Sequence, residues 1–383
     1  MQRAIAFGSS QSGRFLRTFL YQGFNQDERS RQVFEGVWSH VGGAGRGSFN
    51  HRFAQPSRDA RPFFNFFYPT DIFPFSDAEQ TDAETGRTDG LLTRAKQSNT
   101  VPRIFNTNSS YEYYGRAASL IHTTLDGSRD VAPDPRTRIY LIAGGSHGPG
   151  RFPPRKNDTQ NASNANDYTW TLRALLVAMQ QWVEKGVEPP PSQYPKIADG
   201  QLVPLDAVKF PTIPGVAFPT RIHTAFRVDY GPDFLSKGII TVEPPRVGKP
   251  FEMRVPQVDP TDGNEISGIR LPVVRVPLGT HAGWNLRHPN IGAPDELFSM
   301  VGSYIPFAKT RQERIKAGDP RPSMAERYKD RDDYVARITA AANELSATGY
   351  VLKQDVPAIV QQAASHWDYH MEPRVSSVGD PPR

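Results

Sequence analysis

A short segment near the N-terminus carries the residues with the clearest chemical potential. The segment from Gly8 to Ser12 follows an apolar run and precedes a helical pattern. A serine nucleophile on a sharp strand-to-helix turn needs a small residue two positions before it and two after it, because the turn presses those positions against neighbouring backbone. Ser10 meets both conditions, whereas centring the turn on Ser12 would put Arg14 at a small position. The pattern predicts a nucleophile elbow at Ser10, with a phosphate-cradling or purely structural Gly/Ser turn as the alternative.

A serine of ordinary acidity needs a base, and the base needs a carboxylate to orient it. Of the nine histidines, His147 alone lies in a Gly-rich turn directly after a buried-strand candidate. The chain order Ser, acid, His confines the acid to the span between Ser10 and His147. Glu112 fits best because it follows another strand candidate, and Asp126 or Asp130 in a polar stretch typical of a surface turn remain alternatives.

The other chemically suggestive residues lie in loops. Acyl transfer needs two oxyanion donors, and the backbone N–H after the nucleophile, that of Gln11, is expected to be one. The second would come from a loop after an earlier strand, and no strand candidate precedes the elbow. His40 and His51 flank a Gly-rich loop and could line a substrate pocket, although two loop histidines are more often polar surface than metal ligands. The sequence predicts no metal and no cofactor.

Two further patterns favour structure over chemistry. Residues Asp259 to Glu265 crowd three carboxylates and an amide, but they lack the spacing of a calcium loop, so we predict a hairpin turn built on Asp262 and Gly263. The aromatic cluster from Phe63 to Phe75 could bind an apolar acyl group, and the packed core of a lid is the alternative.

The elements that would position these residues follow from hydrophobic periodicity. Four buried-strand candidates run from Arg3 to Phe7, Val33 to Trp38, Arg103 to Thr107, and Arg138 to Ala143. Helical patterns follow the first, third and fourth of them, and the longest of these runs from Tyr168 to Val183. Strands alternating with helices indicate βαβ units, so we predict an α/β fold with a mainly parallel sheet flanked by helices.

The second half of the chain has a different character. Between Val187 and Pro306 lie 19 of the 35 prolines, with short β-like runs at Ile239 to Val242, Phe251 to Val255 and Ile269 to Val276. Because proline is confined to edges and bulges of sheets, this part should form short strands and turns packed on the first part. Helical patterns return at Tyr334 to Leu345 and Val356 to Trp367.

Composition excludes several classes of protein. The 383 residues include 37% hydrophobic side chains, enough for a real core, and no apolar run approaches the roughly 20 residues of a membrane-spanning helix. The net charge is +5, and the basic residues are scattered among Asp and Glu without forming a basic stripe, which argues against a nucleic-acid partner. The absence of cysteine removes disulfides and thiolate chemistry. The opening residues MQRAIAFGSS do not form a signal peptide.

Eight segments occur in the order AFGSSQSGRFLRTFLYQGFN, FEGVWSHVGGAGRG, NTNSSYEYYGR, YLIAGGSHGPG, VPQVDPTDGNEISGIRLP, GWNLRHP, GSYIPFAKT and GDPRPSMAERY. Together they resemble a known family, the bacterial "alpha/beta hydrolase domain" proteins. The resemblance spans Ile5 to about Trp367 and implies an α/β-hydrolase fold with Ser10 as nucleophile, Glu112 as acid and His147 as base. It implies hydrolysis of an ester or similar acyl bond. Relatives carry a long N-terminal part, usually with an export signal, so we expect a chain truncated before the elbow strand and a full-length protein sent to the periplasm or outside.

These observations give a definite set of expectations. The core should occupy residues 1–186, with a lid-like insertion at about 48–100, followed by a Pro-rich β section at 187–310, a helical section at 311–371 and a tail at 372–383. The expected activity is a serine hydrolase that cleaves a carboxylic ester, acting on a small or polymeric substrate. The alternatives are a serine peptidase or amidase with the same triad, and a non-catalytic fragment or binding protein that keeps the fold. The substrate and the oligomeric state are not predicted.

Overall fold

The computed structural model describes residues 3–47, 71–156 and 158–371, and its centre is a four-stranded parallel sheet. The strands lie in the order β1-β2-β5-β6, and every neighbouring pair is parallel, as predicted. Their bounds are Ile5–Ser9 (β1), Gly36–His40 (β2), Arg103–Ser109 (β5) and Thr137–Ile142 (β6). The second strand therefore begins three residues later than the sequence pattern indicated.

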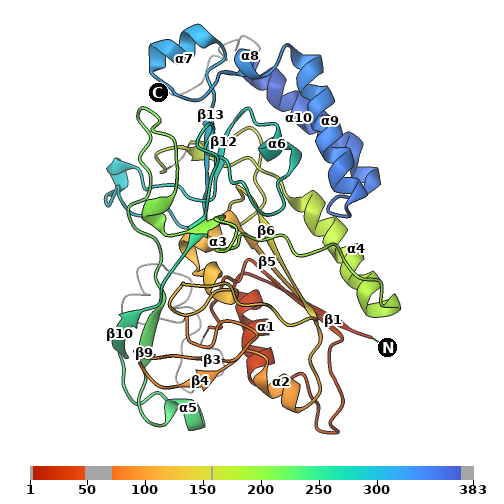
Figure 1. Ribbon diagram of the computed structural model, residues 1–383, viewed down its shortest axis with the longest axis vertical. Coiled ribbons are helices and arrows are strands. Elements are labelled where there is room, and N and C mark those ends of the chain that lie inside the picture. The colour runs from red at the N-terminus through yellow and green to blue at the C-terminus, as the bar shows by residue number, and fades with distance from the viewer. Residues whose placement is uncertain (1–2, 48–70, 157, 372–383) are drawn as a thin grey trace.

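Different helices cover the two faces of the sheet. Val37 and Ile104 point to one face and pack with α1 (Gln11–Tyr21) and α2 (Thr93–Gln97). Their neighbours Trp38 and Phe105 point to the other face and pack with α4 (Thr169–Lys185), as expected from the alternation of side chains along a strand. Figure 1 shows α4 on the side of the sheet away from α1. β2 is buried along its whole length because both faces are covered.

The Pro-rich section forms short strands and turns, as predicted, in which no strand exceeds five residues between 187 and 310. The three β-like runs were interpreted wrongly over most of their length. Of the run from Phe251 to Val255, only Val255 lies in a strand, β11 (Val255–Pro256). The run from Ile239 to Val242 lies between the strands β9 (Phe226–Asp229) and β10 (Arg246–Pro250), and Ile269 to Val276 contains a helical turn, α6 (Pro272–Arg275). Proline at the first helical position suits a helix start because its fixed φ is already helical.

The remaining short elements connect or extend these parts. They are β3 (Gln80–Thr81), β4 (Thr88–Asp89), α3 (Ser110–Gly115), η3 (Ala118–Ile121), β7 (Ala162–Ser163), β8 (Leu202–Val203), η4 (Leu205–Ala207), α5 (Phe234–Lys237), β11 (Val255–Pro256), β12 (Gly279–Ala282), η5 (Pro289–Ile291) and β13 (Ser303–Pro306). β13 pairs antiparallel with both β12 and β7.

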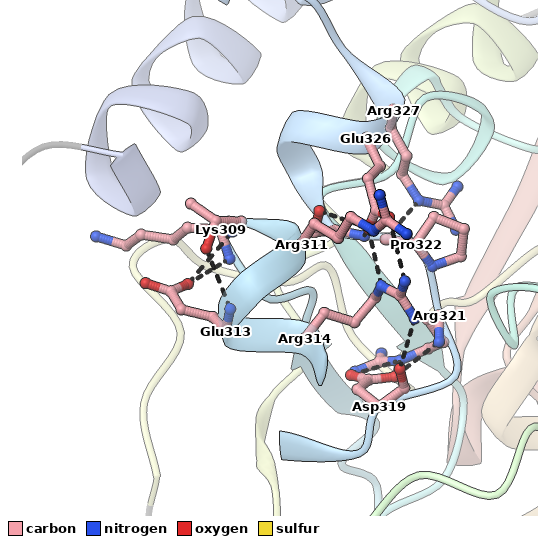
Figure 2. A network of polar contacts seen from close by, with 11 residues as sticks. Lys309, Arg311, Glu313, Arg314, Asp319, Arg321, Pro322, Glu326 and Arg327 are labelled. Atoms are coloured by element: carbon pink, nitrogen blue, oxygen red, sulfur yellow. Dashed lines mark hydrogen bonds and ion pairs between the residues drawn. The ribbon is translucent and has the colours of Figure 1, made fainter. Parts of the chain in front are cut away.

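The C-terminal section is helical, as predicted. It comprises α7 (Arg311–Ala317), α8 (Met324–Arg327), α9 (Arg331–Ala347), η6 (Lys353–Asp355) and α10 (Val356–Met371). α9 and α10 lie side by side (Figure 1). Figure 2 shows how α7 and α8 are joined: Arg314 donates to Glu326 at 2.9 Å, and Arg321 donates to Asp319 at 2.7 Å. The expected tail at 372–383 lies outside the described residues.

Within the described parts of the chain, none of the helices is both long enough and apolar enough to cross a membrane.

Candidate active site

The turn at Ser10 has the geometry of a nucleophile elbow. Ser10 directly follows β1 and precedes α1, with φ of 57° and ψ of −117°. A non-glycine residue in this region costs of the order of 1–3 kcal/mol and is kept only where the surroundings enforce it. A Cβ added to Gly8 would lie 2.4 Å from the carbonyl oxygen of Ser12, so only glycine fits two positions before Ser10. The Ser10 N–H donates to the carbonyl oxygen of His40 at 2.8 Å, which ties the elbow to β2.

His147 lies in a loop that is fixed at several points after β6. The Tyr168 hydroxyl donates to the carbonyl oxygens of His147 and Ser146 at 2.8 and 3.1 Å. The Asn164 amide donates to the carbonyl oxygen of Gly144 at 2.6 Å. These contacts fix the backbone at Gly144, Ser146 and His147, and therefore the position from which the imidazole side chain extends.

Glu112 is the third residue of α3, which begins where β5 ends. Its Oε2 accepts hydrogen bonds from the Ser109 backbone N–H at 2.9 Å and from the Ser109 hydroxyl at 2.6 Å. The side chain is fully buried. Burial raises the pKa of Glu112, but the adjacent His147 ring and the hydrogen bonds from His147 and Ser109 outweigh burial, so the pKa lies below its ordinary value. The carboxyl is therefore ionised at neutral pH.

The fold brings these three side chains into one line. His147 Nε2 lies 2.9 Å from Ser10 Oγ, and His147 Nδ1 lies 2.6 Å from Glu112 Oε1. An ionised carboxylate can only accept hydrogen bonds, so the Nδ1 atom carries the proton in this contact. Nε2 is then unprotonated and accepts the hydrogen bond of the Ser10 hydroxyl. The imidazole is 14% exposed, whereas the carboxylate behind it is inaccessible to water.

The two alternative acids lie elsewhere. Asp126 accepts hydrogen bonds from the Thr124 and Ser128 hydroxyls at 2.5 and 2.8 Å in an exposed turn. Asp130 accepts from the backbone N–H groups of residues 197 and 198, both at 2.9 Å. Asp126 stabilises its own turn, Asp130 joins that region to the distant segment at 197–198, and the carboxylate that His147 contacts is that of Glu112.

His40 lies beside the three residues but is not on the surface as a loop histidine would be. It is the last residue of β2 and is buried, with its Nδ1 atom 2.8 Å from the Thr107 hydroxyl and its ring 6.0 Å from that of Tyr168. Burial lowers the pKa of His40 to about 4, with an opposing effect of Glu112 and a supporting one of His147. His40 is therefore neutral beside His147. His51 lies outside the described residues.

The remaining predicted features fall around this site. Gln11 is the first residue of α1, so its backbone N–H lies next to Ser10. Of the aromatic cluster, Phe73 and Phe75 are buried in a core with Phe251. The rest of the cluster before residue 71, and the first part of the expected lid at 48–70, lie outside the described residues. A surface hollow of about 650 Å³ over residues 79–84 and 124–131 has none of the three residues among its lining. The hollow is therefore separate from the candidate chemistry.

The segment from Asp259 to Glu265 is a hairpin-like turn. Gly263 has φ of +76°, and the N–H of Asp259 donates to the carbonyl oxygen of Asn264 at 2.8 Å. Glu265 at its end is fully buried, which the sequence analysis did not anticipate. Across residues 3–47, 71–156 and 158–371, no group of three or more His, Cys, Asp or Glu side chains could hold a metal ion.

The fold and the site together define a class of protein. A parallel sheet flanked by helices, a strained serine between strand and helix, and the chain order Ser, Glu, His after the parallel strands β1, β5 and β6 are typical of α/β-hydrolases. Residues 1–361 match the family model described as alpha/beta hydrolase domain, and the chain belongs to that family. Comparisons with curated proteins and with solved structures gave no match. Membership supports a hydrolase of the α/β-hydrolase superfamily.

Proposed function

We propose that this protein is a serine hydrolase that cleaves a carboxylic ester through an acyl-enzyme on Ser10. His147 is the general base and Glu112 is the acid that orients it. The observation that supports this proposal is the unbroken chain of two hydrogen bonds, 2.9 Å from Ser10 Oγ to His147 Nε2 and 2.6 Å from His147 Nδ1 to Glu112 Oε1. A Gly/Ser turn that cradles phosphate or serves only as structure would not need this alignment.

In the acylation step, His147 Nε2 takes the proton of the Ser10 hydroxyl while Ser10 Oγ attacks the carbonyl carbon of the ester. The carbonyl oxygen becomes an oxyanion, which the backbone N–H of Gln11 stabilises as one donor of the oxyanion hole. The tetrahedral intermediate collapses, the carbon–oxygen bond to the alcohol breaks, and His147 gives its proton to the leaving alcohol. The product of this step is the acyl-enzyme.

In the deacylation step, His147 takes a proton from water, and the hydroxide attacks the acyl carbon. Collapse of the second intermediate returns the proton to Ser10 Oγ and releases the carboxylic acid. In both steps the imidazole carries a positive charge for a short time. Ionised Glu112 stabilises that charge, and the neutral state of His40 adds no second positive charge beside it.

Intact-mass spectrometry after treatment with a fluorophosphonate tests the proposal. The wild-type chain should gain one adduct, and Ser10→Ala should gain none. Ser12→Ala is the matched control, because it removes a hydroxyl from the same turn and keeps the small residue that the elbow requires. Circular dichroism confirms that all three proteins are folded.

The outcomes separate the alternatives. No adduct on folded wild-type protein would refute an activated serine and favour a non-catalytic binding protein. An adduct on wild type and on Ser12→Ala, but not on Ser10→Ala, supports the proposal. Turnover of p-nitrophenyl esters without turnover of the matching p-nitroanilides then supports an esterase, and comparable turnover of both would favour a peptidase or amidase.

A further inference from the structure

A second glutamate lies close to the catalytic residues without contacting them. Glu265 ends the turn that begins at Asp259, and it is fully buried. One oxygen, Oε1, accepts a hydrogen bond from the Ser110 hydroxyl, and the other, Oε2, accepts one from the backbone N–H of Gly144 at 2.9 Å. A single carboxylate therefore joins two segments that are far apart in the sequence.

These two segments are the ones that carry the acid and the base. Ser110 is two residues before Glu112, and Gly144 is three residues before His147. We propose that Glu265 is a positioning residue, which sets the distance between Glu112 and His147 by holding the start of α3 and the loop after β6 on one carboxylate. This inference rests on the proposed function, because it concerns the same site.

Close packing leaves the two segments little other freedom. A Cβ added to Gly283 would lie 2.2 Å from the Ser110 hydroxyl, so the backbone directly after β12 packs against Ser110. A Cβ added to Gly144, whose φ is +59°, would lie 2.8 Å from the carbonyl oxygen of His281. Besides the contact of His147 with Glu112, the segments share a backbone hydrogen bond from the Tyr111 N–H to the carbonyl oxygen of Gly145 at 3.1 Å. Glu265 adds a link through a third segment, which restricts their relative orientation further.

The turn that presents Glu265 is itself held firmly. The Asn264 side-chain oxygen accepts a hydrogen bond from the His281 N–H at 2.8 Å, and the Thr280 hydroxyl donates to the carbonyl oxygen of Asp262. Arg321, 1% exposed, donates to the same Thr280 hydroxyl at 2.8 Å. Arg321 is fixed in turn by Asp319, in the network of Figure 2. The support therefore extends from the C-terminal section to the catalytic loops.

The electrostatics indicate that Glu265 is not retained for stability. Burial raises the pKa of Glu265 to about 7, against the lowering effects of the Ser110 and Gly144 hydrogen bonds and of Arg270. Of the neighbouring groups, Tyr113 and Tyr114 on α3 stay protonated, because burial and Glu265 both raise their pKa. A raised carboxyl pKa means that the folded protein loses stability as pH rises from the ordinary value towards 7. A neutral residue of the same shape would avoid that loss, so the positioning role rests on the shape of the side chain and its two hydrogen bonds and does not need its charge.

Two substitutions separate positioning from stability. Glu265→Ala leaves the Gly144 N–H and the Ser110 hydroxyl without their partner. Glu265→Gln keeps the shape, since its amide oxygen can accept from Gly144 while its amide N–H donates to the Ser110 oxygen. Asp77→Ala is the matched control. Asp77 is also a fully buried carboxyl, and burial raises its pKa as well. It accepts a hydrogen bond from the Asp134 N–H at 3.2 Å and belongs to neither of the two segments that Glu265 joins.

The readouts are the rate of fluorophosphonate labelling of Ser10, kcat and KM for a p-nitrophenyl ester, and the low-field proton resonance of the His147 Nδ1–H. We expect Glu265→Ala to lower the labelling rate and kcat by about 10- to 100-fold with little change in KM, because a displacement of about 1 Å in a catalytic group costs that much. The low-field resonance should disappear. Glu265→Gln should restore labelling to within about threefold of wild type and melt at a higher temperature at pH 8, and Asp77→Ala should label at the wild-type rate.

Each result counts for or against the inference. Labelling and kcat of folded Glu265→Ala at the wild-type level, or an unchanged low-field resonance, would overturn it while leaving the proposed function intact. If wild type itself fails to label, the proposed function fails, and the low-field resonance in wild type and Glu265→Ala still tests the positioning role. If Glu265→Ala does not fold, Ser110→Ala removes only one of the two contacts, and an unchanged labelling rate in that variant would also refute the inference.

Discussion

Replacing Glu112 by glutamine is the substitution whose effect the geometry determines most completely. Oε2 of Glu112 accepts two hydrogen bonds from Ser109, and Oε1 faces the protonated Nδ1 atom of His147. In Glu112→Gln the amide oxygen must face Ser109, because the Ser109 backbone N–H can only donate. The amide N–H₂ group then faces His147 and forces Nδ1 to accept. The imidazole adopts the tautomer with the proton on Nε2, which cannot take the proton of Ser10.

The size of the effect follows from losing both the tautomer and the charge. In a serine protease, the equivalent change from carboxylate to amide lowers kcat by about 10⁴. At about 1.4 kcal/mol per factor of ten, this is a loss of about 5 kcal/mol of transition-state stabilisation. The site here should show an effect of similar size, because Glu112 is fully buried and no water reaches its position to stabilise the imidazolium in its place. We therefore expect kcat for an ester to fall by about 10³- to 10⁴-fold with KM little changed.

The assay is steady-state hydrolysis of a p-nitrophenyl ester, with thermal melting to verify folding. The matched control is Glu313→Gln, because Glu313 has the same capping role in α7 that Glu112 has in α3: its Oε2 accepts from the Thr310 N–H at 3.3 Å. Glu313→Gln should leave kcat unchanged. A folded Glu112→Gln protein with less than a tenfold loss of kcat would refute the assignment of Glu112 as the acid.

Three further predictions follow from other parts of the structure. Gly8→Ala should reduce the rate of fluorophosphonate labelling by about 10²-fold, because its Cβ would lie 2.4 Å from the Ser12 carbonyl oxygen. Gly148→Ala is the control, because its Cβ would meet open space, and it should label at the wild-type rate. Equal rates for the two variants would contradict the elbow geometry. Tyr168→Phe removes the hydroxyl that holds the His147 carbonyl, so melting should show a loss of about 1 kcal/mol and kcat should fall severalfold; an unchanged kcat would show that the loop needs no such support. Urea unfolding should show that the free energy of unfolding falls as the pH is lowered from 7.5 to 5. The loss should be about 2 kcal/mol for each buried histidine whose pKa burial lowers to about 4 or below, because the unfolded chain binds the protons that the folded chain excludes. A flat profile would refute the burial of these histidines as neutral groups. These histidines are His40, His122, His281 and His366.

The parts of the site that were predictable from sequence are those governed by local rules. The small residues around Ser10 are required by the turn itself, and the close approach of Gly8 to Ser12 is a contact between residues four apart. Glu112 and His147 were predictable because parallel strands place the loops that follow them at one edge of the sheet. Chain order and strand ends were enough to select them.

The role of Glu265 could not be predicted, because it depends on contacts across the chain. Glu265 bonds to Ser110, 155 residues earlier in the sequence, and a single sequence contains no signal of that proximity. Locally, Glu265 is one more acidic residue in a turn. The error at Ile269 to Val276 has a different cause: its β-branched residues favour a strand, but Pro272 suits the start of a helix, and packing against α9 selects α6.

The spacing of the three proposed catalytic residues after their strands is a consequence of the strand order. Ser10 is the first residue after β1, Glu112 the third after β5, and His147 the fifth after β6. In the order β1-β2-β5-β6, β5 lies two strands from β1 and β6 three, which is about 10 and 14 Å at the usual spacing. His147 must reach back over the end of β5 to meet Ser10, so its loop is the longest, and Glu112 lies on the way. A long loop is also the easiest to displace. This is why contacts from Tyr168, Asn164 and Glu265 gather on the loop after β6, and why we expect changes in those contacts to alter kcat as well as stability.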